Sequence, residues 1–271
     1  MAAFAGAGLA VAGAVLQAVV RNPLADPYLL GLNSGASTGV ALVVLVFGSG
    51  AALVRSGAAL AGAVLTIGLV LLLAGAGRAR GPGRIVLAGL AAGYALSAIT
   101  SLLLFLADSP EAARSVMFWL LGSLAAVQPA MLAVVALGVV VGLLLLTGFS
   151  GRIDALASGD DSALTAGLDP ERARFGILAG ASAMVGVIVA GVGGVGFVGL
   201  VVPHLARALV GARHRRILPA AALIGAALLI AADTAARTLL APHEVPVGVV
   251  TGVLGAPFLL LLLARSGRAP A

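Results

Sequence analysis

The sequence contains no lysine and no cysteine. Without lysine there is no Schiff-base residue and no phosphate-binding loop of the G-x-x-x-x-G-K-[ST] type, so the chain cannot hydrolyse nucleotides by that route. Without cysteine, disulfides, thiolate metal sites and cysteine nucleophiles are excluded. Only 4% of the residues are aromatic, and the 16 basic residues are separated by apolar runs. These features argue against a continuous nucleic-acid-binding surface, so no nucleic-acid partner is expected.

Charged residues are also scarce, at 10% of the chain, whereas soluble domains carry about 25%. Hydrophobic residues make up 61% of the 271 residues, before 38 glycines are counted. Apolar runs close to the roughly 20 residues that a membrane-crossing helix needs recur from end to end. The sequence therefore predicts an all-α, polytopic membrane helical bundle, formed by a single domain over residues 1–271. The nine predicted spans are residues 2–20, 29–47, 57–77, 85–107, 128–148, 175–190, 197–210, 217–236 and 246–264.

The arginines orient these spans. Nine crossings place 13 of the 16 arginines on one side and only Arg55, Arg114 and Arg237 on the other. The positive-inside rule then makes the arginine-rich side cytoplasmic. The N-terminus would lie outside, with an apolar helix beginning almost at Met1, so we expect that one further span precedes this sequence. The predicted cytoplasmic loops are 21–27, 78–84, 149–174 and 211–216, and the predicted outer loops are 48–56, 108–116 and 237–245.

Three matches to enzyme motifs fail on context. Residues 35–39 fit G-x-S-x-G, but they lie on a glycine ladder of an apolar helix instead of a strand–turn–helix elbow. Residues 191–196 fit G-x-G-x-x-G without the acidic residue expected about 20 positions later, which favours a tight turn between helices. His243 and Glu244 begin an H-E-x-x-H pattern, but Val247 stands where the second zinc-binding histidine is needed. No catalytic residue and no metal site is predicted.

Three segments carry a family resemblance: residues 8–31, with Arg21-Asn-Pro-Leu-Ala-Asp-Pro27 at their centre; Gly196-Phe-Val-Gly-Leu-Val-Val-Pro-His-Leu-Ala-Arg207; and residues 233–257. In order and spacing the chain resembles permeases of the FecCD type, the type II ABC importers for ferric siderophores, haem and vitamin B12. The resemblance implies ten helices per subunit, a homodimer with a second permease copy, and a place in the bacterial cytoplasmic membrane among its lipids.

Further partners are implied by the same resemblance. Two ATPase subunits would use ATP and Mg, so this chain would bind no cofactor itself and would not be an enzyme. An extracytoplasmic binding protein would deliver the substrate, an iron chelate or a corrinoid, with siderophore, haem and cobalamin left open. The alternative is an ion-coupled secondary transporter of a small organic solute, which needs ionisable residues near the membrane midplane. Almost every acidic residue is predicted in a loop or near a helix end, with Asp233 closest to a span.

Two cytoplasmic segments correspond to the family's inner gate. The first is the loop 21–27, stiffened by two prolines, in which the gate would fall to Asn22 and Leu24. A rigid helix connector is an equally good interpretation of that loop. The second segment is Gly81, Pro82 and Gly83, where family members carry small hydroxyl residues, so its gating chemistry differs.

The loop 149–174 holds half of the acidic residues of the chain. Asp161 is expected to cap a short helix that runs through Leu168, and Asp169 with Pro170 to start the next helix. Leu164 and Leu168, four residues apart, would share one apolar face. The resemblance places the ATPase-coupling helix here, whereas the alternative is a solvated loop. The coupling residues so implied are Asp161, Ser162, Ala163, Leu164, Thr165, Gly167 and Leu168.

Arg237 is one of three arginines on the predicted outer side. It lies one turn after Asp233, so a local i,i+4 ion pair or an interfacial anchor accounts for it in structural terms. In the resembling family the corresponding arginine meets a glutamate of the binding protein. A guanidinium can hold a carboxylate through two parallel hydrogen bonds, which makes Arg237 the predicted docking residue.

Overall fold

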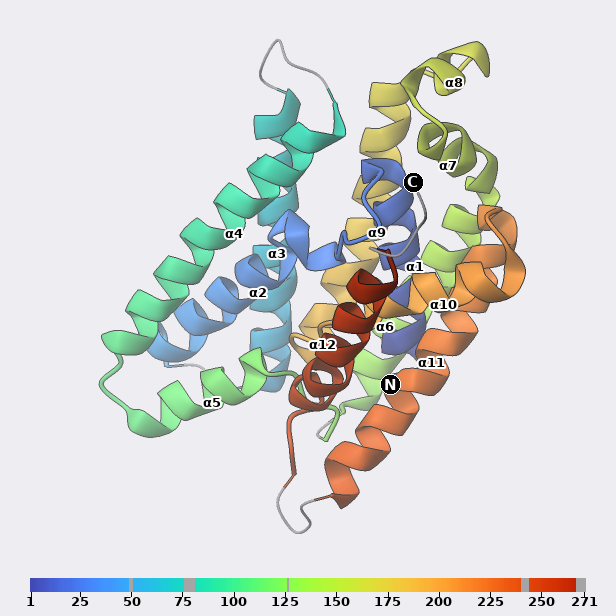
Figure 1. The fold of residues 1–271 in the computed structure, drawn as a ribbon. Coiled ribbons are helices and arrows are strands. Elements are labelled where there is room, and N and C mark those ends of the chain that lie inside the picture. Colours follow the sequence, from blue (N-terminus) through green and yellow to red (C-terminus); the bar gives the residue numbers. More distant parts are fainter. Residues whose placement is uncertain (49–50, 76–80, 126, 240–243, 267–271) are drawn as a thin grey trace.

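The computed structural model describes residues 1–48, 51–75, 81–125, 127–239 and 244–266, and every regular element in these ranges is a helix (Figure 1). The all-α fold class is confirmed. The elements are α1 (Ala2–Val20), η1 (Pro27–Leu30), α2 (Leu32–Ala41), η2 (Leu42–Val46), α3 (Ala52–Gly75), α4 (Pro82–Phe105), α5 (Pro110–Leu120), α6 (Pro129–Gly148), α7 (Ser150–Ala157), α8 (Asp160–Thr165), α9 (Pro170–Val192), α10 (Val198–Val210), α11 (His214–Thr238) and α12 (Val247–Ser266).

Six of these helices are long and apolar enough to cross a membrane: α1, α3, α4, α6, α9 and α11. Three shorter apolar stretches, Leu32–Val46, Val198–Val210 and Val247–Leu260, occupy the remaining predicted spans. The first of them corrects the continuous span predicted over 29–47. Gly31 takes a positive φ of 75° and separates η1 from α2, whereas the backbone continues with helical dihedrals from α2 into the π-helical turn η2.

Helix α5 is a second correction, because its first seven residues fall in the predicted outer loop 108–116. Ser109 caps the helix, with its Oγ accepting a hydrogen bond from the Ala112 amide at 3.2 Å, and Pro110 occupies the first turn. The charges of Glu111 and Arg114 made this short stretch resemble a loop. Its strongly apolar remainder, including Val116 in the core, holds it against the bundle.

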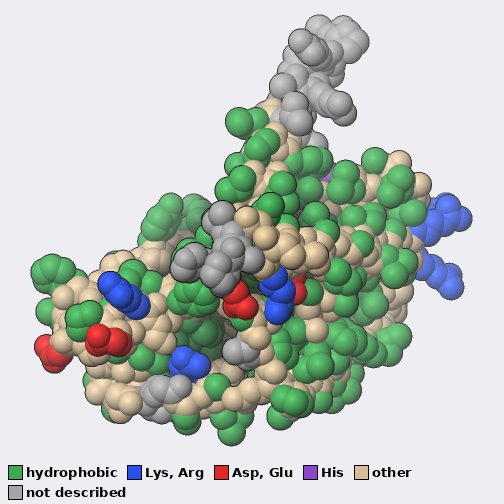
Figure 2. Space-filling view, turned by 90° about the horizontal axis from the view of Figure 1, so that it is seen from below, with side chains coloured by type: hydrophobic (Ala, Val, Ile, Leu, Met, Phe, Trp, Pro, Cys, Tyr) green, Lys and Arg blue, Asp and Glu red, His purple; other side chains and the backbone are tan. Residues whose placement is uncertain are grey.

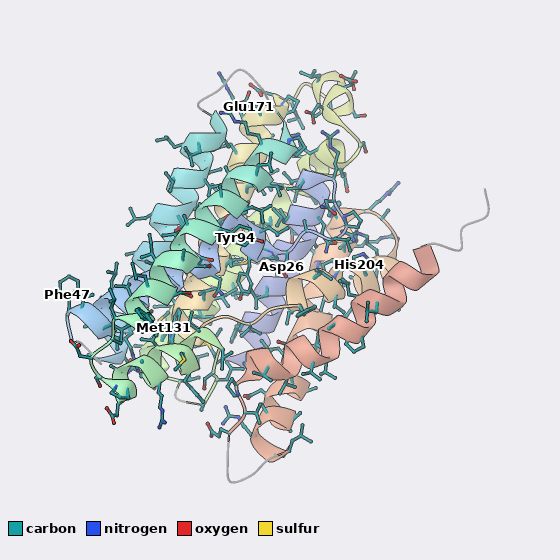
Figure 3. The ribbon with its side chains drawn as sticks, turned by 60° about the vertical axis from the view of Figure 1, so that its left-hand side comes forward. Asp26, Phe47, Tyr94, Met131, Glu171 and His204 are labelled. Carbon is teal, nitrogen blue, oxygen red and sulfur yellow. The ribbon has the colours of Figure 1, made fainter. Side chains whose placement is uncertain are left out.

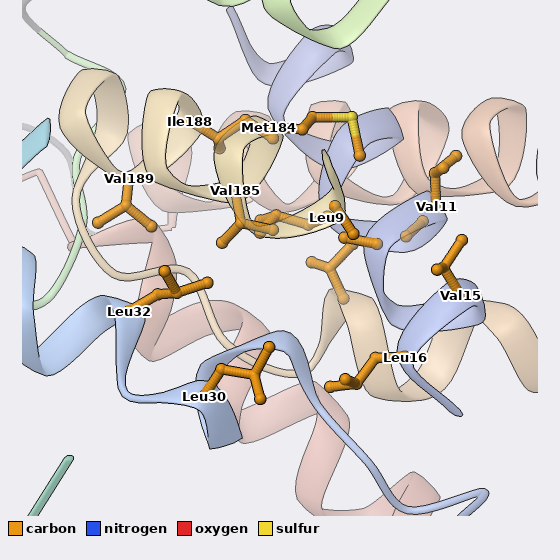
Figure 4. Close-up of a cluster of buried hydrophobic side chains, with 14 of the residues drawn as sticks. Leu9, Val11, Val15, Leu16, Leu30, Leu32, Met184, Val185, Ile188 and Val189 are labelled. Atoms are coloured by element: carbon orange, nitrogen blue, oxygen red, sulfur yellow. The ribbon is translucent and has the colours of Figure 1, made fainter. Parts of the chain in front are cut away.

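Helix α1 lies at the centre of the bundle and is buried over nearly its whole length. Figure 4 shows its apolar side chains packed beside those of α9, together with Leu30 and Leu32. The helix ends where Arg21 adopts a left-handed conformation, with the amides of Arg21 and Asn22 bonded back to Ala18 and Gln17, and Pro23 follows. This Schellman arrangement terminates the helix at the start of the predicted gate loop.

Glycines let the central helices approach closely. A Cβ atom on Gly6 would collide with the carbonyl of Gly225 on α11, and one on Gly13 would collide with Gly199 on α10. The ladder at Gly35 and Gly39 packs in the same way against α3. Close backbone approach stabilises membrane helices through van der Waals contact. The interpretation of residues 35–39 as a packing ladder on a helix is therefore confirmed.

The loops gather at two opposite ends of the bundle. Arg21, Gly81 and the α7–α8 segment meet at one end, which we call the arginine-rich end. Arg55 and Ser115 are hydrogen-bonded at the other end, which we call the outer end. Figure 3 shows Glu171 and Met131 at these opposite ends, and Figure 1 places α8 and α5 likewise. The described parts of loops 21–27, 78–84 and 149–174 thus lie together at one end, and those of loops 48–56 and 108–116 lie together at the other, as the arginines predict.

Candidate coupling and docking sites

Helix α7 is fixed to the bundle by apolar and polar contacts. Ile153 and Leu156 are fully buried, which seats the helix under the arginine-rich end. Asp154 Oδ1 accepts a hydrogen bond from the His214 amide at 3.1 Å and lies 2.6 Å from His214 Nδ1. Asp154 thus satisfies one of the free amides at the start of α11. These contacts join α7 to the start of that long helix.

Helix α8 is held by an ion-pair cluster centred on Asp160. Its Oδ1 lies 2.6 Å from Arg174 Nη2 on α9 and 3.2 Å from Arg21 Nη2 at the end of α1. The Arg174 side chain is only 4% exposed. A buried guanidinium requires a charged partner, so the cluster fixes α8 against α1 and α9. Sequence reasoning missed this cluster because no local spacing relates its three members.

The predicted capping of α8 by Asp161 is wrong. The N-cap is Gly159, which has a φ of 121° and no side chain to cap with. The helix ends at Thr165 and does not reach Leu168. Gly167, with a φ of 75°, donates to Leu164 O, and Leu168 N donates to Ala163 O, which is a Schellman termination. Asp169, in contrast, caps α9 as predicted, accepting from the amides of Glu171 and Arg172.

Because α8 ends at Thr165, the prediction that Leu164 and Leu168 share one apolar helix face is also wrong. Leu164 is 59% exposed on α8, whereas Leu168 lies beyond the helix and packs against the core. The turn at Gly167 redirects the chain between them. Both leucines still line one hollow, of about 580 Å³, between α8 and the start of α9. Leu164 is the leucine that a partner could reach.

The gate segments border this region in different ways. Gly81 lines the same hollow as Leu164 and Leu168, and Pro82 and Gly83 follow it in the first turn of α4. Asn22 and Leu24 do not line the hollow. They are exposed beside Arg21, and Asn22 Oδ1 accepts from the Leu24 amide at 2.9 Å. That local hydrogen bond fits a rigid connector, and a gating role for Asn22, Leu24 and Gly81–Gly83 stays a prediction.

Arg237 lies at the outer end, far from the coupling helices. Its Nε donates to Asp233 Oδ1 at 3.1 Å, which confirms the local ion pair. Its Nη2 also donates to the Leu124 carbonyl at 2.8 Å, in the connector between α5 and α6. The side chain remains 44% exposed. Arg237 is thus held in place while part of its guanidinium faces the surface, and docking of a partner there stays a prediction. His243 and residues 240–242 of this loop lie outside the described residues.

The glycine run at 191–196 connects two helices, as expected. Helix α9 ends at Val192 and α10 begins at Val198. The Val192 carbonyl accepts from Ser123 N at 2.9 Å, and Val195 N donates to the Tyr28 hydroxyl at 3.0 Å. Gln17, buried on α1, donates to the Leu200 carbonyl at 3.2 Å. Hydrogen bonds to protein groups therefore compensate the break between these two apolar helices.

Apolar helices of spanning length, irregular backbone buried within the bundle and polar helical connectors at one end define a multi-pass membrane protein of the transporter type. The chain belongs to the FecCD transport family, whose sequence model matches residues 1–265. It is thus a relative of the permease subunits of ABC importers, and sequence and structural comparisons agree on this.

Three relatives illustrate the range of the family. The Fe(3+) dicitrate transport system permease protein FecD of Escherichia coli is 38% identical over 98% of this chain and 82% of its own length. The hemin transport system permease protein HmuU of Yersinia pestis is also 38% identical, over 98% of this chain and 80% of its own length. The cobalamin import system permease protein BtuC of Halobacterium salinarum is 38% identical, over 97% of this chain and 70% of its own length. A solved metal-chelate type ABC transporter in an inward-facing conformation matches with a TM-score of 0.91 at 31% identity, covering 97% of this chain and 83% of its own.

The orientation of the two ends yields a direct test, because the chain has no native cysteine. A single cysteine replacing Ser109 at the outer end should react with an impermeant thiol reagent in intact cells. One replacing Ser158, an exposed residue between α7 and α8, should react only after the cells are opened. Labelling is read by mass shift. Reaction at position 158 from outside would invert the orientation. Ser49, a further candidate, lies outside the described residues.

Proposed function

We propose that this chain is the membrane-spanning permease of a binding-protein-dependent ABC importer and moves a metal chelate or a corrinoid into the cytoplasm. The observation that carries the proposal is the family match over residues 1–265, together with the structural match at a TM-score of 0.91. The relatives named for ferric dicitrate, hemin and cobalamin are all permeases, and they agree on a large organic chelate as cargo. Siderophore, haem and corrinoid remain the three candidate classes.

Energy would come from a separate ATPase that docks on α7 and α8. Three features support this division of labour. The chain has no lysine for a phosphate-binding loop. Leu164 is exposed on a short helix at the arginine-rich end. The Asp160 cluster joins that helix to α1 and α9. A movement of α8 would therefore be coupled to α1 and α9 through the Asp160 cluster.

A second permease copy, two ATPase subunits and an extracytoplasmic binding protein complete the proposed complex. Arg237 would receive the binding protein at the outer end, and the segments at Asn22, Leu24 and Gly81–Gly83 would open at the other end. The permease itself would hold a path and two alternating gates. Such a two-state element moves only when a partner binds its states with different affinity, which is the role assigned to the ATPase.

The test is uptake by vesicles that contain the whole complex. We expect uptake of the chelate to continue when ionophores collapse the membrane potential and the proton gradient. Uptake should fall to background when ATP is withheld inside. The physical reason is that the described acidic residues lie in connectors, in the short helices α7 and α8, or in the first or last two turns of a longer helix, which leaves few groups for ion coupling. The opposite pattern would identify an ion-coupled secondary transporter: ionophores would abolish uptake, and withholding ATP would leave uptake unchanged.

A further inference from the structure

We propose that the hollow at the outer end, between α3, α5, the start of α6 and the end of α9, binds a small carboxylate-bearing anion. The hollow has a volume of about 530 Å³, within the range of roughly 300 to 1,000 Å³ typical of small-molecule sites. Figure 2 looks onto this end and shows a recess bordered by a few arginine and acidic side chains on a mostly apolar surface. The inference rests on the proposed function, because it names a chemical class for the incoming chelate.

Arg55 is the first reason for choosing an anion. It lies in the first turn of α3 and lines the hollow, where its Nη1 donates one hydrogen bond of 3.3 Å to Ser115 Oγ. Its Nε is buried without a hydrogen-bond partner. Arg21, Arg174 and Arg237 each have a carboxylate within 3.2 Å. A partly buried guanidinium with unused donors is a ready partner for an external carboxylate.

The charge of the lining is the second reason. Arg114 on α5 adds a second, exposed guanidinium, and Glu111, one turn earlier, adds the carboxylate. In the described chain no ion pair within 4.0 Å links Glu111 to either arginine, and its Oε2 accepts from Ser109 Oγ at 3.2 Å. Two positive groups and one negative group leave the lining with a charge of +1. The apolar walls of a recess strengthen the positive potential inside it, and this potential favours the entry of an anion.

The shape of the site favours a small molecule over a protein surface. Arg114 is exposed, whereas Arg55 is half-buried, so a ligand that meets both must enter the recess. Trp119 and Gln128 also line it, and they offer an aromatic face and an amide. Carboxylates suit this lining because a guanidinium binds them through two parallel hydrogen bonds. The geometry thus points to a carboxylate-rich ligand or chelate, held at the outer end before it crosses.

The site contains its own reporter, because Trp119 is the only tryptophan of the chain. The purified permease, in discs of zwitterionic phosphatidylcholine, is titrated with citrate and with gallium citrate while Trp119 fluorescence is recorded. We expect a saturable change. Arg55→Gln and Arg114→Gln should each raise the Kd about tenfold or more, as expected for loss of a charge-assisted hydrogen bond. Arg216→Gln, which changes an exposed arginine at the start of α11 and outside the hollow, should leave the Kd unchanged.

Glu111→Gln provides a test of opposite sign, because removing the repelling carboxylate should lower the Kd severalfold. Misfolding cannot imitate tighter binding, so this variant keeps the test decisive if an arginine variant is unstable. Absence of a saturable change, or an equal loss in Arg216→Gln, would overturn the site. The permease is also placed in discs of anionic phosphatidylglycerol without citrate. If these discs alone change the Trp119 fluorescence, and the change is lost in Arg55→Gln, the arginines bind a lipid headgroup and the proposed site is wrong.

The titration uses the permease without its partners, which separates this inference from the proposed function. If ATP-driven uptake fails while Trp119 still reports citrate binding, the proposed function is wrong and the site stands. If uptake is normal and Trp119 reports no binding, the site is wrong and the proposed function stands.

Discussion

Replacing Leu164 by Asp is expected to separate the permease from its ATPase and to abolish uptake. Leu164 is 59% exposed on α8, so the new carboxylate costs the isolated permease little. In the complex it would be buried in an apolar groove, at a cost of several kcal/mol. Each 1.4 kcal/mol is a factor of about ten in affinity, so binding should weaken by more than about a hundredfold. The measurement is co-purification of the ATPase with the tagged permease.

Ser158→Asp is the matched control, because it adds the same charge on an exposed residue of the same connector, outside α8. It should leave ATPase binding and uptake close to normal. The thermal unfolding temperature of both variants should match the parent protein. Leu168→Asp is expected to behave differently, by lowering that temperature, because Leu168 packs against the core. Normal co-purification and uptake by Leu164→Asp would show that α8 is not the ATPase contact.

Arg237→Glu is expected to weaken docking of the binding protein by about ten- to a hundredfold at low salt. The estimate corresponds to loss of a charge-assisted hydrogen bond, together with repulsion between two carboxylates. Salt screens exposed charges, so the difference from the parent protein should shrink as ionic strength rises. Docking is measured by surface binding of the labelled binding protein to the permease in discs. A Glu→Arg change at the contacting position of the binding protein should restore part of the affinity.

Asp233→Asn separates docking from local structure. It removes the ion pair at 3.1 Å but leaves the Arg237 charge and its hydrogen bond to the Leu124 carbonyl. Docking should therefore persist in Asp233→Asn, and ATPase binding should persist in both variants. If Arg237→Glu docks normally at low salt, Arg237 is a structural link between α11 and the connector before α6, and the docking assignment fails.

Features set by neighbours along the chain could be predicted from the sequence. The spans follow from apolar runs of known length, and the two sets of loops follow from the arginines. The Asp169 cap and the Asp233–Arg237 pair also depend on positions at most four residues apart. Helix α5 and the division of the span at Gly31 were missed, because short apolar stretches near charges or glycines fit several local structures.

Composition and local spacing by themselves determined that this protein is an all-helical membrane bundle, with a capped connector on one side and a fixed arginine on the other. Only the tertiary structure decided that Asp160 joins Arg21 and Arg174 and that Leu168 turns inward while Leu164 stays exposed. It also decided that Arg55 and Arg114 share one hollow. The physical reason is that helical periodicity relates residues within about one turn, whereas contacts between helices depend on how the glycine-rich faces of separate helices pack.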